Sequence, residues 1–382
     1  MKKISIIGST GSIGVQALDV VRGGGFSVCA LAAGRSAGRL EEQARAFLPQ
    51  YVALADEKEA LRLRGRLADT PVKVLAGAEG VCAAASLPQA DIVLNAAVGI
   101  AGLEPTLAAI EAGKTLALAN KESLVCGGAL VMERARKRGT EILPVDSEHS
   151  AVFQALRCGL PREVSRIVLT ASGGPFFGKT AEELRGVTPE QALRHPSWNM
   201  GAKITVDSST LMNKGFEVIE ARWLFDLPPE RIDVVVHRES IVHSMVEFCD
   251  GTVAAICSPP DMHLPIQLAL TWPERRPPMR KQLSFTEAMQ WSFCPPDRET
   301  VPALALCEAV LRRGGNLGAV LNGANEEAVA LFLQKRIGYC DITRLVRAAV
   351  EAADFVGSPE TGEIFASDRW AREYVRAAAQ RG

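Results

Sequence analysis

Residues 4–14 read ISIIGSTGSIG, a short apolar run that leads straight into three glycines. The apolar run predicts a buried β-strand, and the periodic stretch at 15–22 predicts a helix directly after the glycines. Glycines allow a tight turn between the two, and the helix N-terminus presents N–H groups to a pyrophosphate. Because the spacing is GxxGxxG rather than GxGxxG, a plain strand–turn–helix is the alternative, but the flanking strand and helix favour a nucleotide site.

The sequence after this turn repeats the same alternation as far as residue 145. Further apolar runs rich in β-branched residues lie at 27–33, 51–55, 72–76, 92–96, 115–119 and 142–145. Helical patterns lie between them, for instance at 39–47, 58–66 and 103–112. Strands that are apolar almost throughout and alternate with helices predict a parallel sheet covered on both faces. We therefore expect an α/β fold that begins with a doubly wound parallel-sheet domain over residues 1–146.

Beyond residue 146 the pattern of predicted strands and helices changes. Strand-like stretches lie close together at 164–171, 233–238, 244–249 and 252–257. They predict a central α+β domain at 147–275 with a mixed sheet. The proline-rich stretch at 276–300 is expected to form an extended linker. Helical patterns at 303–313, 325–336, 342–353 and 367–379 predict a C-terminal helical bundle over 301–382.

Composition excludes several classes of function. The 382 residues include 43 Lys and Arg against 44 Asp and Glu, a balance that argues against a nucleic-acid-binding surface. Nine cysteines without a CxxC pair argue against a disulfide framework or a zinc site and indicate free thiols in a reducing compartment. No run of about 18 apolar residues occurs, so we expect no membrane span. A soluble, cytoplasmic protein is expected.

The end of the second predicted strand bears on the choice of cofactor. Enzymes that bind NAD place an Asp or Glu there, about 20 residues beyond the glycines, to bind the ribose 2′-hydroxyl. This chain has Gly34-Arg35-Ser36 instead, and no acid follows until Glu41. An arginine and a hydroxyl suit a 2′-phosphate, which an acid would repel. The pattern favours NADP over NAD, and the alternative is a solvated basic loop.

Asp146 and Glu148 follow the last predicted strand of the first domain. In an extended chain residues i and i+2 face the same side, so the two carboxylates are expected to point together. They lie at the carboxyl end of a parallel strand, where ligands bind in such sheets. Neighbouring carboxylates repel each other unless a cation or a proton lies between them. Metal ligation and helix capping both remain open for this pair.

A second polar cluster lies in the central domain. Ser208 precedes Asn213, Lys214 and Glu217, which share one helix face at i,i+3 and i,i+4 spacing. Hydroxyl, amide and ammonium groups suit a phosphate, and Glu217 adds a carboxylate. The alternative is an amphipathic helix with a capping serine and an ordinary Lys–Glu pair. Glu220, one turn further, is interpreted as a supporting or surface residue.

The segment at about 172–202 lies between these clusters and is rich in glycine and proline. We expect it to form a lid loop that closes over a ligand. It begins at Ser172 and contains His195 and Trp198 near its end. A lone His or Trp in a loop is more often a packing residue than a chemical one, so these residues alone leave both roles open.

Taken together, these segments resemble the 1-deoxy-D-xylulose 5-phosphate reductoisomerase family, in the same order along the whole chain. The segments are 8–14, 119–123, 144–149, 171–175, 195–201, 207–217 and 322–327. PVDSEH at 144–149 together with MNKGFEVIEA at 212–221 makes the resemblance specific. It implies an N-terminal NADPH domain, a catalytic domain, a linker, a C-terminal four-helix bundle and a homodimer.

The resemblance also implies roles for individual residues. Asp146, Glu148 and Glu217 would hold a divalent cation, Mg²⁺ or Mn²⁺, with Co²⁺ also serving. The substrate phosphate would be bound, with help from His195, by Ser172, Ser208, Asn213 and Lys214. Lys121 and Ser147 would contact the substrate backbone, and Trp198 would cover it. The residues that would contact NADPH are Thr10, Gly11, Ser12, Ile13, Gly34, Arg35, Ser36, Asn120, Glu122 and Gly201. Relatives often have Lys-Asn in place of Arg35-Ser36, which likewise supplies a cation and a hydrogen-bonding group.

The activity that the resemblance implies is a rearrangement followed by a reduction. A phosphorylated ketose, 1-deoxy-D-xylulose 5-phosphate, would become a branched aldehyde, and NADPH would reduce it to 2-C-methyl-D-erythritol 4-phosphate for isoprenoid precursors. No nucleic-acid or membrane partner is expected. One alternative is an ordinary NADP-dependent sugar or semialdehyde dehydrogenase, which works without added metal. The other is a catalytically silent nucleotide-sensing protein, which binds NADPH without oxidising it.

Overall fold

The computed structural model describes residues 1–198, 200–286 and 288–381, and the chain divides into two compact units. The first unit comprises 1–123, 129–150 and 261–281, and the second comprises 124–128, 151–260 and 282–382. The sequence predicted boundaries at 146, 275 and 300. The structure groups 261–281 with the N-terminal part, because helix α12 (His263–Thr271) packs against α1 (Ser12–Arg22).

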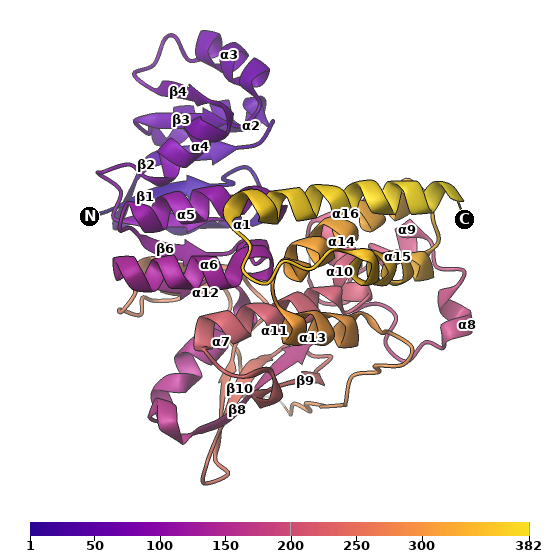
Figure 1. The fold of residues 1–382 in the computed structure, drawn as a ribbon. Coiled ribbons are helices and arrows are strands. Elements are labelled where there is room, and N and C mark those ends of the chain that lie inside the picture. The colour runs from indigo at the N-terminus through magenta and orange to yellow at the C-terminus, as the bar shows by residue number, and fades with distance from the viewer. Residues whose placement is uncertain (199, 287, 382) are drawn as a thin grey trace. The chain divides into compact units, whose positions relative to one another are not determined.

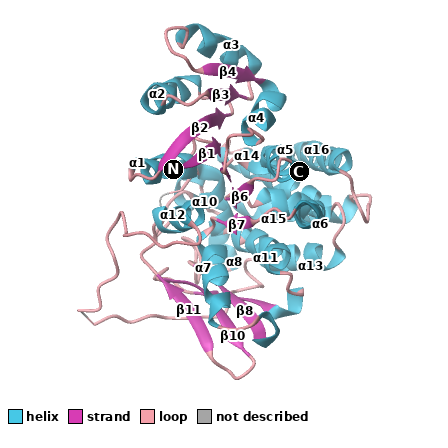
Figure 2. Ribbon diagram, turned by 90° about the vertical axis from the view of Figure 1, so that its left-hand side faces the viewer, coloured by secondary structure: helices cyan, strands magenta, loops and turns pink. Residues whose placement is uncertain are grey.

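The first unit is built around seven parallel strands in the order β4-β3-β2-β1-β5-β6-β7. The strands are β1 (Lys2–Ile7), β2 (Phe26–Ala33), β3 (Tyr51–Leu54), β4 (Lys73–Ala76), β5 (Ile92–Asn95), β6 (Thr115–Leu118) and β7 (Ile142–Pro144). The other helices are α2 (Ala37–Phe47), α3 (Glu57–Arg66), α4 (Gly77–Ala85), α5 (Leu103–Glu111) and α6 (Glu122–Arg138). Figure 2 shows α1, α2 and α12 on one side of the strands and α4 and α5 on the other. The doubly wound sheet expected from the sequence is confirmed.

The second unit contains a four-stranded mixed sheet in the order β11-β10-β8-β9 (Figure 2). Its strands are β8 (Val164–Ala171), β9 (Ile232–Val236), β10 (Val242–Phe248) and β11 (Val253–Cys257). Strand β8 runs parallel to β9 and antiparallel to β10. One face of this sheet packs against α11 (Met212–Phe225) through buried residues such as Leu169 and Val218. This confirms the α+β architecture with a mixed sheet.

Short elements and loops connect the larger ones in this unit. The predicted lid segment contains two one-turn helices, α8 (Ala181–Leu184) and α9 (Pro189–Ala192), and is followed by α10 (Ala202–Ser209). The described part of the predicted linker, 276–300, contains no helix and only one isolated bridge, from Cys294 to Val236.

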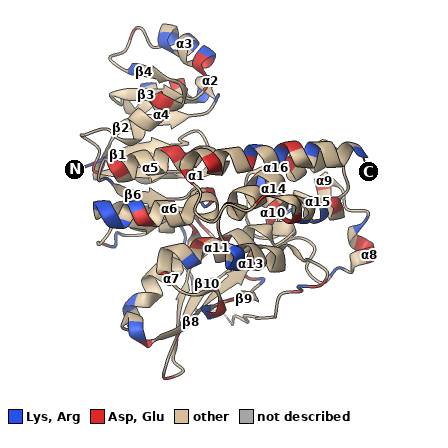
Figure 3. Cartoon of the chain, viewed as in Figure 1, with Lys and Arg blue, Asp and Glu red and all other residues tan. Residues whose placement is uncertain are grey.

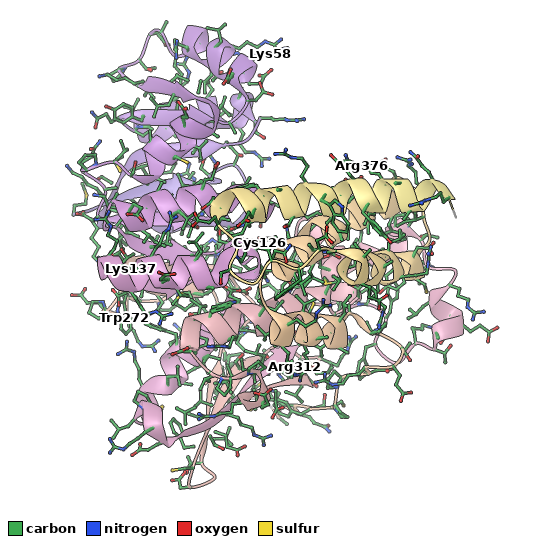
Figure 4. The ribbon with its side chains drawn as sticks, viewed as in Figure 1. Lys58, Cys126, Lys137, Trp272, Arg312 and Arg376 are labelled. Atoms are coloured by element: carbon green, nitrogen blue, oxygen red, sulfur yellow. The ribbon has the colours of Figure 1, made fainter. Side chains whose placement is uncertain are left out.

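Four helices form the C-terminal part of the second unit. They are α13 (Ala303–Arg313), α14 (Leu317–Leu333), α15 (Tyr339–Ala352) and α16 (Thr361–Arg381). Figure 1 shows α16 lying along α14 and α15, and Figure 3 shows acidic and basic residues interspersed along it. One of the basic residues, Arg376, pairs with Glu327 of α14 at 2.7 Å (Figure 4). Among the described residues, no helix has the length and apolar character that a membrane span requires.

Helix α14 is longer than the sequence predicted. The pattern predicted a helix from residue 325, whereas the helix begins at Leu317 and contains Gly318 and Gly323. A Cβ would lie 2.0 Å from the Val125 carbonyl oxygen at the first glycine and 2.3 Å from the Asp368 carbonyl oxygen at the second. Both glycines are therefore sites of close backbone approach.

Candidate active site

The turn between β1 and α1 places a helix N-terminus at the carboxyl edge of the parallel sheet. Gly8 has a φ of 82°, and a Cβ there would lie 2.3 Å from the Ala96 carbonyl oxygen. A Cβ at Gly14 would lie 2.3 Å from the Gly8 carbonyl oxygen. Within the described chain no side chain caps α1, so the N–H groups of its first turn are suited to accept an anion as a partner. The predicted cofactor residues of this turn are Thr10, Gly11, Ser12 and Ile13, all exposed or half-buried.

The loop after β2 gives this edge of the sheet positive charge. Its predicted cofactor residues are Gly34, Arg35 and Ser36, all of which are exposed. Arg39, in the first turn of α2, donates a hydrogen bond to the Thr10 carbonyl (2.8 Å) and so connects α2 to the glycine turn. The acid after the next strand, Asp56, accepts from two backbone N–H groups and caps α3. Because Asp56 is engaged in capping α3, the loop after β2 presents the basic Arg35 to this edge of the sheet, which suits a 2′-phosphate.

The buried amide of Asn120 connects the loops that follow β5 and β6. The Nδ2 atom of Asn120 lies 2.9 Å from the Ala97 oxygen, 3.0 Å from the Gly99 oxygen and 2.8 Å from the Glu122 carboxylate. Its Oδ1 atom accepts from the Ser123 N–H (3.0 Å). Asn120 and Glu122, both predicted to contact NADPH, are therefore held rigidly at the carboxyl edge of the sheet.

The ends of the neighbouring strands β6 and β7 bring a lysine and an aspartate together. The Nζ atom of Lys121 lies 2.7 Å from Oδ2 of Asp146, and these side chains are only 9% and 14% exposed. Ser147 donates a hydrogen bond to Glu148 (2.6 Å). Because the ion pair is sheltered from water, its electrostatic attraction is stronger than that of a surface pair.

The extended geometry predicted for Asp146 and Glu148 is wrong. Strand β7 ends at Pro144, and helix α7 (Ser147–Ala155) begins directly after Asp146, whose carbonyl accepts from the Ser150 N–H (2.8 Å). Both carboxylates thus stand at a helix N-terminus, where the helix dipole favours negative charge. Asp and Ser are compatible with a strand end and are also helix-capping residues, so the sequence pattern did not distinguish the two.

In the second unit, one histidine joins two serines that were predicted to bind phosphate. The Nε2 atom of His195 lies 3.0 Å from Oγ of Ser172 and 3.1 Å from Oγ of Ser208. Ser172 follows strand β8 and Ser208 lies in α10, so tertiary folding brings the pair together. Gly174, with a φ of 65°, permits this approach, because a Cβ there would lie 2.8 Å from the Ser208 carbonyl oxygen.

The hydrogen bonds of His195 define its protonation. Its Nδ1 atom accepts from the backbone N–H groups of Ser197 (3.2 Å) and Trp198 (3.0 Å). An accepting nitrogen carries no proton, so the neutral ring carries its proton on Nε2, toward the two serine hydroxyls. Burial lowers the pKa of His195 below its ordinary value, and the positive charge of Arg238 lowers it further.

Three polar side chains at the start of α11 form a second group. Asn213 and Lys214 both donate to Glu217, and the side chains of Lys214 and Glu217 are only 4% and 1% exposed. An ordinary surface pair, the alternative from the sequence, does not fit this burial. Glu220, one turn further, was interpreted as a supporting or a surface residue. It is fully buried, so the surface alternative is wrong and the supporting role stays a prediction.

Sequence analysis missed Arg238. Its guanidinium donates to the carbonyl oxygens of Ser172 (2.8 Å) and Gly174 (2.6 Å) and lies 5.2 Å from the centre of the Phe177 ring. Arg238 therefore holds the loop that carries Ser172. Its position at the end of a predicted strand, 233–238, was the available signal, but its carbonyl partners have no sequence pattern.

The other predicted residues of the second unit lie just before α10. Trp198 is half-buried, with its ring centre 6.2 Å from that of His243. Gly201 is the exposed N-cap of α10. Asn199, in the segment that carries the resemblance, lies outside the described residues.

These features define a class of protein: a dinucleotide-binding α/β protein whose second unit carries a polar cluster suited to an anion. The chain belongs to the 1-deoxy-D-xylulose 5-phosphate reductoisomerase family. The family model "1-deoxy-D-xylulose 5-phosphate reductoisomerase" matches residues 4–128. Models for the "1-deoxy-D-xylulose 5-phosphate reductoisomerase C-terminal domain" and the "DXP reductoisomerase C-terminal domain" match 142–225 and 257–374.

Curated relatives and solved structures agree with this assignment. The chain is 49% identical over 376 residues to the reductoisomerase of Agathobacter rectalis, covering 98% of this chain and 99% of the relative. It is 51% identical over 378 residues to that of Chlorobaculum tepidum, with the same coverage. The Zymomonas mobilis enzyme in complex with NADPH superimposes with a TM-score of 0.92 at 41% identity, covering 99% of both chains. A reductoisomerase complex with NADPH, fosmidomycin and magnesium gives 0.94 at 36% identity, covering 100% of this chain and 98% of that one.

Proposed function

We propose that this protein catalyses the NADPH- and divalent-metal-dependent conversion of 1-deoxy-D-xylulose 5-phosphate to 2-C-methyl-D-erythritol 4-phosphate, a step toward isoprenoid precursors. Relatives about half identical over nearly the whole chain are named for this reaction, which supports the proposal. The observation that carries it in this chain is the His195 cluster, in which two serine hydroxyls and an imidazole converge as donors for a phosphate.

The first unit fits NADPH. The glycine turn brings a helix N-terminus without a side-chain cap to the carboxyl edge of the sheet, where a pyrophosphate binds in this fold. Arg35 and Ser36 offer a cation and a hydroxyl to the 2′-phosphate. Asn120 and Glu122 form the rigid rim along which the nicotinamide end would lie. A relative's structure contains NADPH, which supports the same use of this unit.

We further propose that Asp146, Glu148 and Glu217 bind the divalent cation, Mg²⁺ or Mn²⁺. Carboxylate oxygens suit these hard cations. Within its own unit each carboxylate meets a polar partner: an ammonium for Asp146, a hydroxyl for Glu148 and an amide for Glu217. When bound, the cation supplies Lewis acidity to the substrate's carbonyl and hydroxyl, and NADPH supplies a hydride.

The chain's own residues orient the substrate and handle its protons. The Nε2–H of His195 and the hydroxyls of Ser172 and Ser208 would donate to phosphate oxygens, while Lys214 neutralises the phosphate charge with help from Asn213. Lys121, sheltered beside Asp146, is the ammonium group available to hold or donate a proton at the substrate's oxygens. Ser147 would contact the substrate backbone. Trp198 would cover the substrate and exclude water when the lid closes.

The decisive experiment follows NADPH absorbance after 1-deoxy-D-xylulose 5-phosphate is added, with and without Mg²⁺ or Mn²⁺. We expect oxidation only when both the ketose phosphate and the metal are present. Oxidation that is equally fast after chelation would favour an ordinary dehydrogenase. NADPH binding without oxidation would favour a nucleotide-sensing protein.

We propose that the protein is a homodimer, as the family resemblance implies. Strand β11 lies at the edge of its sheet, and alternate residues along it are exposed, which supports an edge that pairs with a second copy. Light scattering coupled to gel filtration should give twice the mass of the chain. A cytoplasmic location is also proposed, supported by the finding that no disulfide bond forms among the described cysteines. Fractionation of the native host's cells tests that location.

A further inference from the structure

The C-terminal helices contact the serine cluster of the second unit through Tyr339. This residue is the first of α15, and only 5% of it is exposed. Its hydroxyl donates to the carbonyl oxygen of Ser209, the last residue of α10, over 2.8 Å. The preceding residue, Ser208, carries the hydroxyl that meets His195. Tyr339 therefore fixes the end of the helix that presents this hydroxyl.

The ring of Tyr339 also contacts the loop that carries the other serine. It packs edge-on against Phe176, with the ring centres 5.2 Å apart. Phe176 lies in the same loop as Ser172, directly after β8. The Tyr339 ring also packs against Phe332 of α14, with the ring centres 5.8 Å apart. One side chain thus connects both serine-bearing segments to the C-terminal helices.

A second connection comes from Asn325 in α14. Its Nδ2 atom donates to Oδ1 of Asp207 over 2.8 Å, and both residues are buried. The other carboxylate oxygen, Oδ2, pairs with Nζ of Lys203 at 2.8 Å. Asp207 directly precedes Ser208 in α10, and successive helical residues point about 100° apart. Fixing the direction of the aspartate therefore fixes the direction of the serine.

A phosphate site needs such support because its donors must be held in place. Donor groups work when they lie within about 0.5 Å of the productive geometry. Yet Ser172 lies in a loop, and α10 has only 8 residues, a length at which an isolated helix is marginal. The rigidity of these two segments must come from the elements that pack on them, and α14 and α15 supply it.

We propose that Tyr339 and Asn325 are positioning residues of the phosphate site, through which the C-terminal helices set the places of Ser172 and Ser208. Neither residue touches the substrate in this proposal, which rests on the function proposed above. Removing their polar groups weakens the binding of the substrate phosphate, while the nucleotide turn of the first unit keeps its geometry.

Two variants and a matched control test the proposal in the full-length protein. Tyr339→Phe keeps the ring and removes the hydroxyl, and Asn325→Ala removes the amide. The control, Asn322→Ala, lies one turn earlier on α14 and is equally buried, but its amide donates to Glu326 and Asp368 instead of α10. We expect the KM for 1-deoxy-D-xylulose 5-phosphate to rise about threefold to tenfold in both variants, as for one lost hydrogen bond. The KM for NADPH should stay unchanged, and the control should keep both values.

Inorganic phosphate provides a second readout as a competitive inhibitor of the ketose. Its inhibition constant should weaken in Tyr339→Phe and Asn325→Ala by a factor similar to that for KM. If neither constant changes more than in the control, or if all three variants change in step with their melting temperatures, the positioning role is overturned. A wild-type protein that oxidises no NADPH with the ketose and metal overturns the proposed function instead, and the inference with it.

Discussion

The glycine turn of the first unit and the His195 cluster of the second unit, which are both proposed to bind an anion, are built in different ways. The turn uses backbone N–H groups, and its glycines lie within one stretch of seven residues, 8–14. The cluster uses side chains from the loop after β8, the end of the lid segment and α10, with Arg238 from a fourth segment holding the loop in place. A backbone site depends on local conformation, whereas a side-chain site depends on tertiary packing. Substitutions in the two regions should therefore impair binding for different reasons, by changing the local backbone in the first and the packing of side chains in the second.

The largest effect is expected from Glu217→Gln in the second unit. Removing the carboxylate charge should lower kcat/KM by at least about a hundredfold and abolish the response to added Mg²⁺, because metal sites are sensitive even to groups around the ligands. Steady-state NADPH oxidation at several Mg²⁺ concentrations measures this effect. Glu327→Gln, which removes a carboxylate of α14 paired with Arg376, is the control. Near-normal activity of Glu217→Gln would remove this residue from the metal site.

In the first unit, changing Arg35 and Ser36 together to Asp should shift the cofactor preference from NADPH toward NADH. Losing charge-assisted hydrogen bonds to the 2′-phosphate and adding repulsion should weaken NADPH relative to NADH by about tenfold to a hundredfold. The ratio of kcat/KM for the two cofactors measures the change. Arg35→Lys, which keeps the positive charge, is the matched control and should retain most of the preference. An unchanged ratio in the Asp variant would refute the 2′-phosphate assignment.

Two glycine-to-alanine substitutions distinguish the effect of close packing from the effect of simply lying in a helix. A Cβ at Gly14 would meet backbone atoms at 2.3 Å and 2.5 Å, whereas a Cβ at Gly38 in α2 would meet nothing within 4 Å. Gly14→Ala should lower the free energy of unfolding by about 1–3 kcal/mol and weaken NADPH binding. Gly38→Ala should raise stability by about 0.5–1 kcal/mol. Urea unfolding with and without NADPH measures both, and equal stabilities would contradict the close approach.

The smallest effect concerns pH and the His195 cluster. Because burial lowers the folded-state pKa of His195 from its ordinary 6.5, the unfolded chain takes up the proton first as the pH falls. The stability that this residue contributes is present above about pH 6.5 and is lost progressively below it. His195→Gln should therefore show a shallower loss of unfolding free energy between pH 7 and pH 5.5. Parallel slopes for wild type and variant, measured by urea unfolding, would contradict this account.

The first unit could be predicted well because each of its signals is local. Strands buried on both faces are apolar throughout. The turn glycines lie between an apolar run and a helical pattern, both of which are visible in the sequence. The observed strands begin and end within one or two residues of the predicted ranges. The exception is the stretch after β7, where Asp146 and Glu148 turned out to stand at a helix N-terminus. The same residue types occur at helix N-termini and at strand ends, so the sequence did not distinguish the two.

The second unit was predicted in outline only. Its strands follow from their apolar runs, and Lys214 with Glu217 follows from helical spacing. The role of Arg238 could not be predicted, because its partners are carbonyl oxygens, which every residue carries. Nor could the links from Tyr339 and Asn325, since they join α10 to helices more than a hundred positions further along the chain.

The sequence by itself determined the parallel sheet, the nucleotide turn and the types of residue available for catalysis. These follow from hydrophobic periodicity, glycine spacing and side-chain chemistry, which act over a few residues. Only the tertiary structure decided which nitrogen of His195 faces the serines, how deeply Lys214 and Glu217 are buried, and which distant helices hold the serine cluster in place. Those properties depend on packing between segments far apart in the chain, and the free energy of such contacts is fixed by distance and burial rather than by local pattern.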